Sequence, residues 1–347
     1  MTLVLNRPDV PSSDGREQLC PRTKEARTSS DATALRIALV NNMPDAALED
    51  TEAQFLGLLQ AAAQEIQFEV TFFTLPSLPR GKQARAHLDS HYLVLAELLN
   101  DHFDGVIITG TEPHHPDLCD EPYWDELTQL MDWAEERTSS TVLSCLAAHA
   151  GVLRSDGILR QRLENKRFGV FSEIKVEEHA LTHSIAAPIC FPHSRWNDLC
   201  SQDLIRCGYR VLTRSTDAGV GLFVKEKKNS LFVHFQGHPE YGERTLFKEY
   251  RRDIRRFLRK ERQTYPPPPQ GYFDARAYDL LDRFRLEAIA CPNEEILEKF
   301  PESSVVETLQ KSWHSPSVSI YNSWLQYLMC KRVATSHDYR SLHATGG

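Results

Sequence analysis

Short apolar runs alternate with helical segments along the first half of the chain, and this alternation constrains the fold more than any other feature. The runs at 36–40 and 103–110 end in glycine or other turn-forming residues, which suits a strand buried inside a sheet. Strands separated by amphipathic helices pair in parallel through right-handed crossovers. We therefore expect an α/β fold with a doubly wound, mostly parallel sheet flanked by helices. The strands are expected at residues 36–40, 68–75, 103–110 and 141–145, and the helices at 49–64, 91–101, 123–136 and 146–153.

The second half of the chain begins with further strand patterns and ends in helices. Four prolines at 266–269 cannot continue a helix and predict an extended connector. We expect a mobile arm over 1–34, a catalytic domain over 35–264, a connector with packed helices over 265–334 and a frayed tail over 335–347. The strands are expected at 174–176, 187–191, 209–212, 221–224 and 231–235, and the helices at 244–259, 275–290 and 312–332.

Composition and charge exclude several classes of protein. The 347 residues carry a net charge of −8, which gives the chain no electrostatic reason to bind nucleic acid or an anionic membrane. No apolar run approaches the length of about 18 residues that suits a membrane span, and the N-terminus lacks the apolar segment of a signal peptide. The eight cysteines are scattered without a CxxC pair, which argues against a disulfide framework or a zinc cluster. We expect a cytoplasmic protein.

Cys145 is the sharpest local feature, because it lies where a buried strand runs directly into a helix. Such a junction forces a tight turn that exposes the side chain above the carboxyl ends of the strands. The helix N-terminus favours a thiolate and presents free N–H groups to a developing oxyanion. The N–H of Leu146 is one candidate donor, and that of Thr111, after the neighbouring strand, is a second. An ordinary buried cysteine is the alternative interpretation.

His238 and Glu240 form the second feature, in a His-Pro-Glu sequence that follows the last strong strand. In an extended turn, residues two apart lean toward the same side. A nucleophilic thiol needs a base that takes its proton and an acid that orients the base. Taken alone, the sequence also suits an exposed turn with an ion pair. Together with Cys145 it predicts nucleophilic catalysis.

The sequence resembles the homoserine O-acyltransferase (homoserine O-succinyltransferase) family of methionine biosynthesis, which shares the fold of class I glutamine amidotransferases. The resemblance runs from about Ile37 to Trp324. It implies that Cys145 carries an acyl thioester, with His238 as proton acceptor and Glu240 as its partner. It also implies that Lys166, Ser194 and Arg252 contact substrate. The motifs that carry it are residues 42–44, 103–110, 123–127, 166–171, 192–195, 237–241, 249–253 and 322–325.

The substrate-contacting positions make chemical sense, although each has an ordinary alternative. Lys166 and Arg252 are cations that suit the carboxylate of an amino acid, and Ser194 offers a hydroxyl. A lysine beside another basic residue is usually solvated, and Arg252 lies in a charged run typical of an exposed helix face.

Two places depart from the usual family pattern. Leu146 and His149 replace a tryptophan and a glutamine, and His149 either reaches the site or packs inside. In the loop after residues 109–110, His114 aligns with the position that selects the acyl group, where glutamate goes with acetyl and glycine with succinyl. Histidine tolerates a second carboxylate better than glutamate does, which favours succinyl. A shift of one residue would make Glu112 the selector.

The sequence thus predicts ping-pong transfer of an acyl group from acyl-CoA through Cys145 to the hydroxyl of homoserine. No cofactor is expected to be permanently bound, and acyl-CoA serves as co-substrate. The adjacent His114 and His115 point in different directions without a third ligand, so no metal is expected. The resemblance implies a homodimer. A glutamine amidotransferase, a γ-glutamyl hydrolase, and the same transfer to serine stay open as alternatives.

Overall fold

The computed structural model describes residues 4–5, 34–185, 189–309 and 311–344. Its centre is an eight-stranded sheet in which the first six strands are parallel, and β11 pairs antiparallel with both of its neighbours, β12 and β8. This arrangement confirms the predicted α/β class with a mostly parallel sheet. In sheet order the strands are β1 (Val4–Leu5), β3 (Phe68–Phe73), β2 (Leu35–Val40), β4 (Gly105–Ile108), β5 (Ser140–Ser144), β12 (Ser230–Phe235), β11 (Leu222–Lys227) and β8 (Arg210–Val211).

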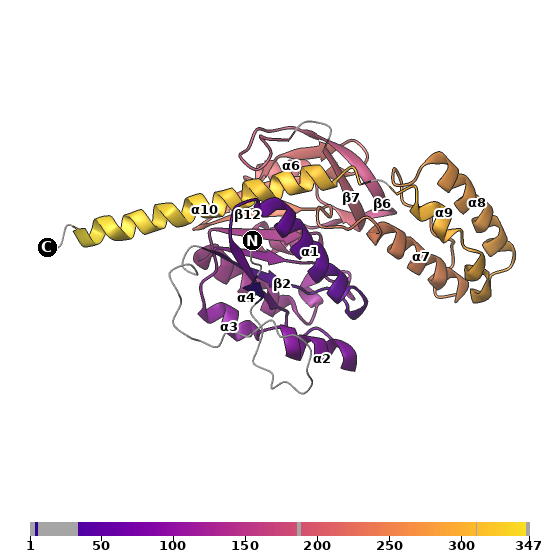
Figure 1. Cartoon of the computed structure of the whole chain (residues 1–347), viewed down its shortest axis with the longest axis horizontal. Coiled ribbons are helices and arrows are strands. Elements are labelled where there is room, and N and C mark those ends of the chain that lie inside the picture. Colours follow the sequence, from indigo (N-terminus) through magenta and orange to yellow (C-terminus); the bar gives the residue numbers. More distant parts are fainter. Residues whose placement is uncertain (1–3, 6–33, 186–188, 310, 345–347) are drawn as a thin grey trace.

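Helices cover both faces of this sheet because alternate side chains of each buried strand point to opposite sides. In β4, Ile107 joins a core with α1 (Leu48–Ala63) and α10 (His314–Ala344). Its neighbours Val106 and Ile108 join the opposite core. The helices of that second face are α3 (Leu95–Asn100), α4 (Trp124–Arg137) and α5 (Leu146–Asp156). Figure 1 shows α10 crossing the body and continuing well beyond it.

A smaller antiparallel sheet and a helical lobe complete the molecule. Figure 1 shows the lobe projecting from the body at the end opposite to the free part of α10. The small sheet contains β6 (Gln161–Lys175), β7 (Ile189–Asp198), β9 (Thr213–Ser215) and β10 (Gly219–Val220), and the lobe contains α7 (Thr245–Leu258), α8 (Ala275–Ala290) and α9 (Glu302–Val306). The remaining short helices are α2 (Lys82–His91), α6 (Ser201–Arg206), η1 (Asp45–Ala47), η2 (Leu118–Asp120) and η3 (Glu294–Lys299).

Several boundaries differ from the sequence prediction, each for a local reason. The helix expected at 91–101 is shorter and corresponds to α3, which begins at Leu95, and the preceding helix α2 was not predicted. Strand β6 starts at Gln161, long before the predicted 174–176, and its first half was missed because those residues are mostly polar and partly or fully exposed. Helix α10 continues to Ala344 through the segment where we expected fraying, since neither glycine nor proline interrupts it after Pro316.

Two of the predicted segments, the N-terminal arm and the proline connector, can be compared with the structure. Within the predicted arm, Val4–Leu5 pairs with β3, and residues 1–3 and 6–33 lie outside the described residues. Residues 266–269 run extended between α7 and α8, as the prolines predicted. Among the described residues, no helix combines the length and apolar character needed to cross a membrane.

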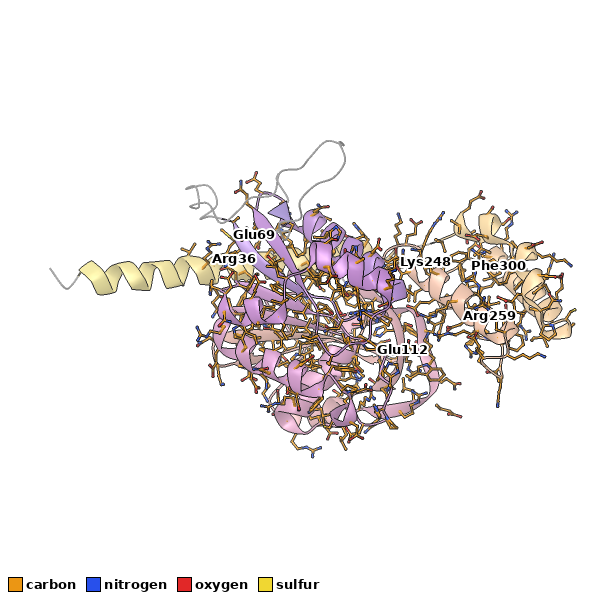
Figure 2. All side chains as sticks on the ribbon, turned by 90° about the horizontal axis from the view of Figure 1, so that it is seen from below. Arg36, Glu69, Glu112, Lys248, Arg259 and Phe300 are labelled. Atoms are coloured by element: carbon orange, nitrogen blue, oxygen red, sulfur yellow. The ribbon has the colours of Figure 1, made fainter. Side chains whose placement is uncertain are left out.

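Ion pairs fix both ends of α7. Lys248 binds Asp50 of α1 at 2.5 Å, and Arg259 binds Glu294 at 2.6 Å. Figure 2 shows Lys248 where the lobe meets the body and Arg259 farther out.

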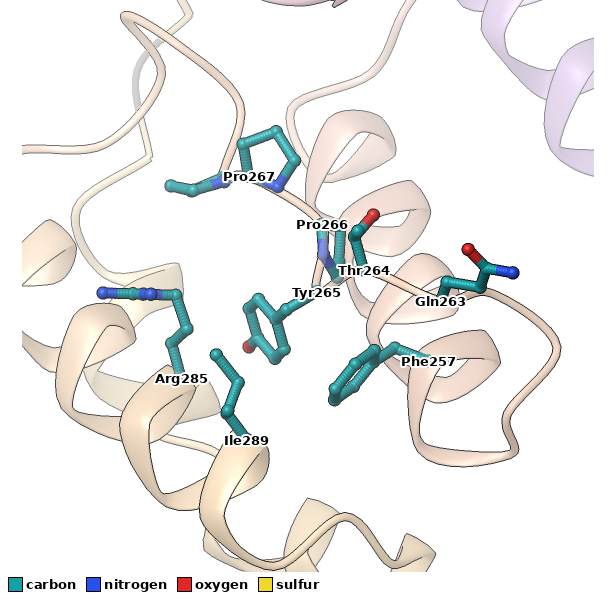
Figure 3. Close-up of a pocket in the computed structure, with 9 residues that line it drawn as sticks. Phe257, Gln263, Thr264, Tyr265, Pro266, Pro267, Arg285 and Ile289 are labelled. Atoms are coloured by element: carbon teal, nitrogen blue, oxygen red, sulfur yellow. The ribbon is translucent and has the colours of Figure 1, made fainter.

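A pocket of about 640 Å³ lies in the lobe, between the connector and α8, and none of the predicted site residues lines it (Figure 3). Its lining is Phe257, Gln263, Thr264, Tyr265, Pro266, Pro267, Pro268, Arg285 and Ile289.

Candidate active site

Cys145 lies between β5 and α5 in a backbone conformation that side chains rarely adopt. Its φ is 51° and its ψ is −108°. The Cys145 N–H donates to the carbonyl of Phe235 in β12 at 2.8 Å, and its carbonyl accepts from the first turn of α5. A strained residue between strand and helix is the geometry that lifts a nucleophile above the sheet. Its side chain is half-buried.

His238 and Glu240 lie beside this thiol. The Nδ1 of His238 and the Oε1 of Glu240 are 2.8 Å apart, and both residues are buried. The same carboxylate oxygen accepts a hydrogen bond from the Ser144 hydroxyl at 3.4 Å. The Cys145 thiol lies close enough to the imidazole of His238 for its charge to raise the pKa of His238. The three predicted catalytic side chains are therefore in contact, in the order thiol, imidazole, carboxylate.

The environment of His238 favours its protonated form. Burial lowers the pKa of His238, but the charges and hydrogen bonds of Cys145 and Glu240 outweigh burial and raise that pKa well above its usual value. The ring of Tyr241 stacks on the imidazole, with centroids 4.2 Å apart. The imidazole is thus fixed in orientation and equipped to hold a proton next to sulfur.

This arrangement makes the stability of the protein depend on pH. Because the pKa of His238 is raised above its unfolded value of about 6.5, the extra stability is complete below about pH 6.5 and is lost as pH rises through the raised pKa. We expect the wild type to exceed Glu240→Gln in free energy of unfolding most at about pH 6 and least at about pH 9. Urea unfolding over this range measures the difference, and a difference that grows with pH would contradict the pairing.

The backbone around Cys145 approaches the end of β4 closely. A Cβ placed on Gly110 would lie 3.0 Å from the backbone nitrogen of Leu146, so a side chain here would push that backbone away by a few tenths of an ångström. Leu146 is the first residue of α5, where backbone N–H groups have no partner within the helix. The turn that contains Thr111 therefore begins beside the N–H of Leu146, as the predicted pair of oxyanion donors requires.

Lys166, Ser194 and Arg252, the predicted substrate contacts, gather around Glu249. The Oε2 of Glu249 lies 2.5 Å from the Ser194 hydroxyl, 3.4 Å from Lys166 Nζ and 3.8 Å from Arg252 Nη2. Its Oε1 accepts from the Tyr241 hydroxyl at 2.7 Å. Tyr241 also stacks on His238, so the cluster borders the thiol, imidazole and carboxylate group.

Sequence reasoning assigned no role to Glu249 or to Asp253, whose carboxylate lies 3.6 Å from Lys166 Nζ. With Lys166 and Arg252 they form a patch of two cations and two carboxylates. Glu249 is three residues before Arg252, which places both on one face of α7. That spacing is the signal that was available, although any charged helix face shows it.

His149 packs inside the molecule. Its Nε2 pairs with Oε1 of Gln236 at 2.9 Å, and burial is the main cause that lowers its pKa to about 3. A histidine this buried stays neutral and supports Gln236. Of its two predicted uses, packing is therefore the one that its contacts support. His114, the predicted acyl selector, lies in the loop after β4 with its side chain exposed.

A buried network that sequence reasoning missed lies beneath the His238 turn. The Nε of Arg195 donates to Nδ1 of His193 at 3.3 Å, and Nε2 of His193 lies 3.1 Å from Glu173. A Cβ on Gly237 would come within 3.0 Å of that imidazole, and the His238 N–H donates to the carbonyl of Pro192. The network therefore supports the backbone segment that carries His238.

In the described part of the chain, no three histidine, cysteine or acidic side chains are grouped as the ligands of a metal ion would be.

Comparison with known proteins shows which family the chain belongs to. The chain is 44% identical over 297 residues to a homoserine O-succinyltransferase of Rhodopseudomonas palustris, covering 86% of this chain and 89% of the relative. It is 41% identical to one of Bradyrhizobium japonicum, with 87% and 92% covered. A glutamine amidotransferase structure from Thermotoga maritima is similar at 12% identity and a TM-score of 0.47, covering 85% of this chain and 98% of that one. The sequence model of homoserine O-succinyltransferases matches residues 14–335, and the chain therefore belongs to this family of acyltransferases.

Proposed function

We propose that this protein transfers a succinyl group from succinyl-CoA to the hydroxyl of homoserine, through a thioester on Cys145. The observation that carries the proposal is the contact of Cys145, His238 and Glu240 at a strand-to-helix junction, in a member of a family named for this reaction. A thiol, a base and an orienting carboxylate are the groups that covalent acyl transfer needs.

In the first half-reaction, the sulfur of Cys145 attacks the thioester carbonyl of the acyl-CoA. The carbonyl electron pair moves to oxygen, where the N–H groups of Leu146 and Thr111 are the proposed donors. When the intermediate collapses, the bond to the coenzyme A sulfur breaks and His238 donates a proton to that leaving thiolate. The acyl group then remains on Cys145.

In the second half-reaction, homoserine replaces coenzyme A. His238, now neutral, takes the proton of the homoserine hydroxyl as its oxygen attacks the acyl-enzyme carbonyl. The carbon–sulfur bond breaks, the O-acyl ester leaves and Cys145 returns as thiolate beside protonated His238. Water must be kept from the thioester, since it would otherwise compete with homoserine.

The cluster around Glu249 suits a zwitterionic amino acid. Lys166 and Arg252 can receive the carboxylate, Arg252 with two N–H groups. Glu249 is the acceptor for the ammonium group, and Ser194 supplies a hydroxyl beside it. Homoserine differs from serine by one methylene, which a pocket distinguishes only weakly. Steady-state assays with both acceptors decide between them.

The donor assignment rests on charge and on the named relatives. The distal carboxylate of a succinyl group would be repelled by a glutamate at the selector position, and this chain has His114 there. The relatives described above are named for succinyl transfer. The homodimer implied by the family resemblance and the cytoplasmic location expected from the composition stay predictions, to be measured by light scattering and cell fractionation.

Trapping the acyl-enzyme tests the proposal directly. Incubation with succinyl-CoA alone is expected to add the mass of one succinyl group per chain in intact-protein mass spectrometry. Adding homoserine should then remove it, because the hydroxyl attacks the thioester. A Cys291→Ala control, at an exposed cysteine of the lobe, should still be labelled. Turnover of glutamine without coenzyme A, and no adduct, would instead favour a glutamine amidotransferase or a γ-glutamyl hydrolase.

A further inference from the structure

The loop at residues 111–117 is fixed from two sides. On one side, Oε1 of Glu121 accepts hydrogen bonds from the backbone N–H groups of His114 and His115, at 2.6 and 2.7 Å. On the other side, Nη2 of Arg160 donates to the carbonyls of Pro116 and His115, at 3.0 and 3.5 Å. Glu121 is only 3% exposed. The backbone of the loop is therefore held by charged side chains, although the side chains of His114 and His115 are exposed.

This loop borders the nucleophile. It follows Gly110, which approaches the backbone nitrogen of Leu146, the residue after Cys145. Arg160 also lies close enough to α5 for its charge to contribute, after burial and Arg195, to the lowered pKa of His149. His149 is one helical turn beyond Cys145. Glu121 and Arg160 thus hold a loop that begins directly after Gly110, beside the N-terminal end of α5.

Glu121 and Arg160 also share one buried environment with Tyr123. Burial raises the pKa of Tyr123, the charge of Glu121 raises it further, and the charge of Arg160 opposes that rise. Among the described residues, Oε2 of Glu121, Nη1 of Arg160 and the Tyr123 hydroxyl are buried without a hydrogen-bond partner. An unpaired buried polar group is destabilising, so a purely structural loop would gain from apolar residues here.

We propose that Glu121 is a positioning residue for acyl-donor selection, and that it works with Arg160 to fix the loop carrying His114 and Glu112 beside Cys145. The inference rests on the proposed acyl transfer and deepens it. Selection between donors that differ in a terminal carboxylate requires the selecting side chain to keep one position relative to the thioester. In this protein, Glu121 and Arg160 set the position of the selecting side chain through their contacts with the backbone of its loop.

The test compares donor preference in loop-clamp variants of the full-length protein. The ratio of kcat/KM for succinyl-CoA to kcat/KM for acetyl-CoA is measured at saturating homoserine. Glu121→Ala removes both backbone contacts, so we expect this ratio to move about tenfold toward one. Glu121→Gln keeps an acceptor oxygen and should retain the wild-type ratio. Arg160→Gln, which loosens the opposite side, should move the ratio in the same direction as Glu121→Ala.

Glu126→Ala is the matched control. Glu126 holds the backbone N–H of Ser77 at 3.0 Å in a different loop, so it tests the loss of a carboxylate clamp elsewhere. It should leave the ratio unchanged. An equal fall in kcat/KM for both donors in Glu121→Ala would overturn the proposal. A Glu121→Gln variant with the same donor ratio as Glu121→Ala would also overturn it, because the charge of Glu121 rather than the position of the loop would then set the preference. A wild type inactive with both donors would refute the proposed function itself.

Discussion

Replacing Cys145 with alanine is expected to lower kcat/KM for acyl transfer by about 10⁴-fold or more. The substitution removes the sulfur that is proposed to carry the acyl group, while the Cβ stays in place on a backbone whose φ is 51°. Loss of one member of a catalytic unit costs nearly as much as loss of the whole unit. Steady-state kinetics with succinyl-CoA and homoserine measure the effect.

The Cys145→Ala variant has to be shown to fold. Its far-ultraviolet circular dichroism and unfolding midpoint should match those of the wild type, since alanine fits the half-buried site. Cys291→Ala, at an exposed position, should keep full activity. If Cys145→Ala and Cys145→Ser both retained wild-type rates, transfer through this sulfur would be excluded. Direct transfer between bound acyl-CoA and homoserine would then replace the two-step scheme.

The positions of the first buried strands were predictable because their chemistry is local. β4 is an unbroken apolar run and β2 is interrupted only by Arg36, and such runs have few alternatives to a buried parallel strand. The junction at Cys145 was predictable for the same reason, since an apolar strand passes without a loop into an alanine-rich helix. Helix α2 was missed because Ala84 is its only buried residue, which leaves no apolar stripe to detect.

The rest of the site depends on contacts between distant segments. Ser194 and Glu249 meet at 2.5 Å although 55 residues separate them, and no local pattern predicts that contact. No sequence pattern marks Glu121 either, because its importance depends on its contacts with the backbone N–H groups of His114 and His115. Family resemblance supplied Lys166, Ser194 and Arg252 as positions. Only the folded chain identifies the carboxylate at their centre.

For helix α10, too, the sequence predicted only part of the structure. A packed helix was expected at 312–332, but not how deeply its aromatic residues are buried against the sheet. Trp324 is 1% exposed and its Nε1 donates to the Ser140 hydroxyl of β5 at 2.9 Å. A Cβ on Gly105 of β4 would lie 2.8 Å from the indole, so the helix is in close contact with the sheet. This part of α10 is therefore a component of the core beneath the candidate active site.

Trp324→Ala is accordingly expected to lower the free energy of unfolding by about 4 kcal/mol. The change empties a site between α10 and the sheet that neighbours fill only partly, and it removes the indole donor from Ser140. Urea unfolding followed by circular dichroism measures the loss. Trp196→Ala is the matched control, because Trp196 is 39% exposed and packs mainly against Arg162, so a loss of less than about 1 kcal/mol is expected. Equal losses in the two variants would mean that α10 does not belong to the core.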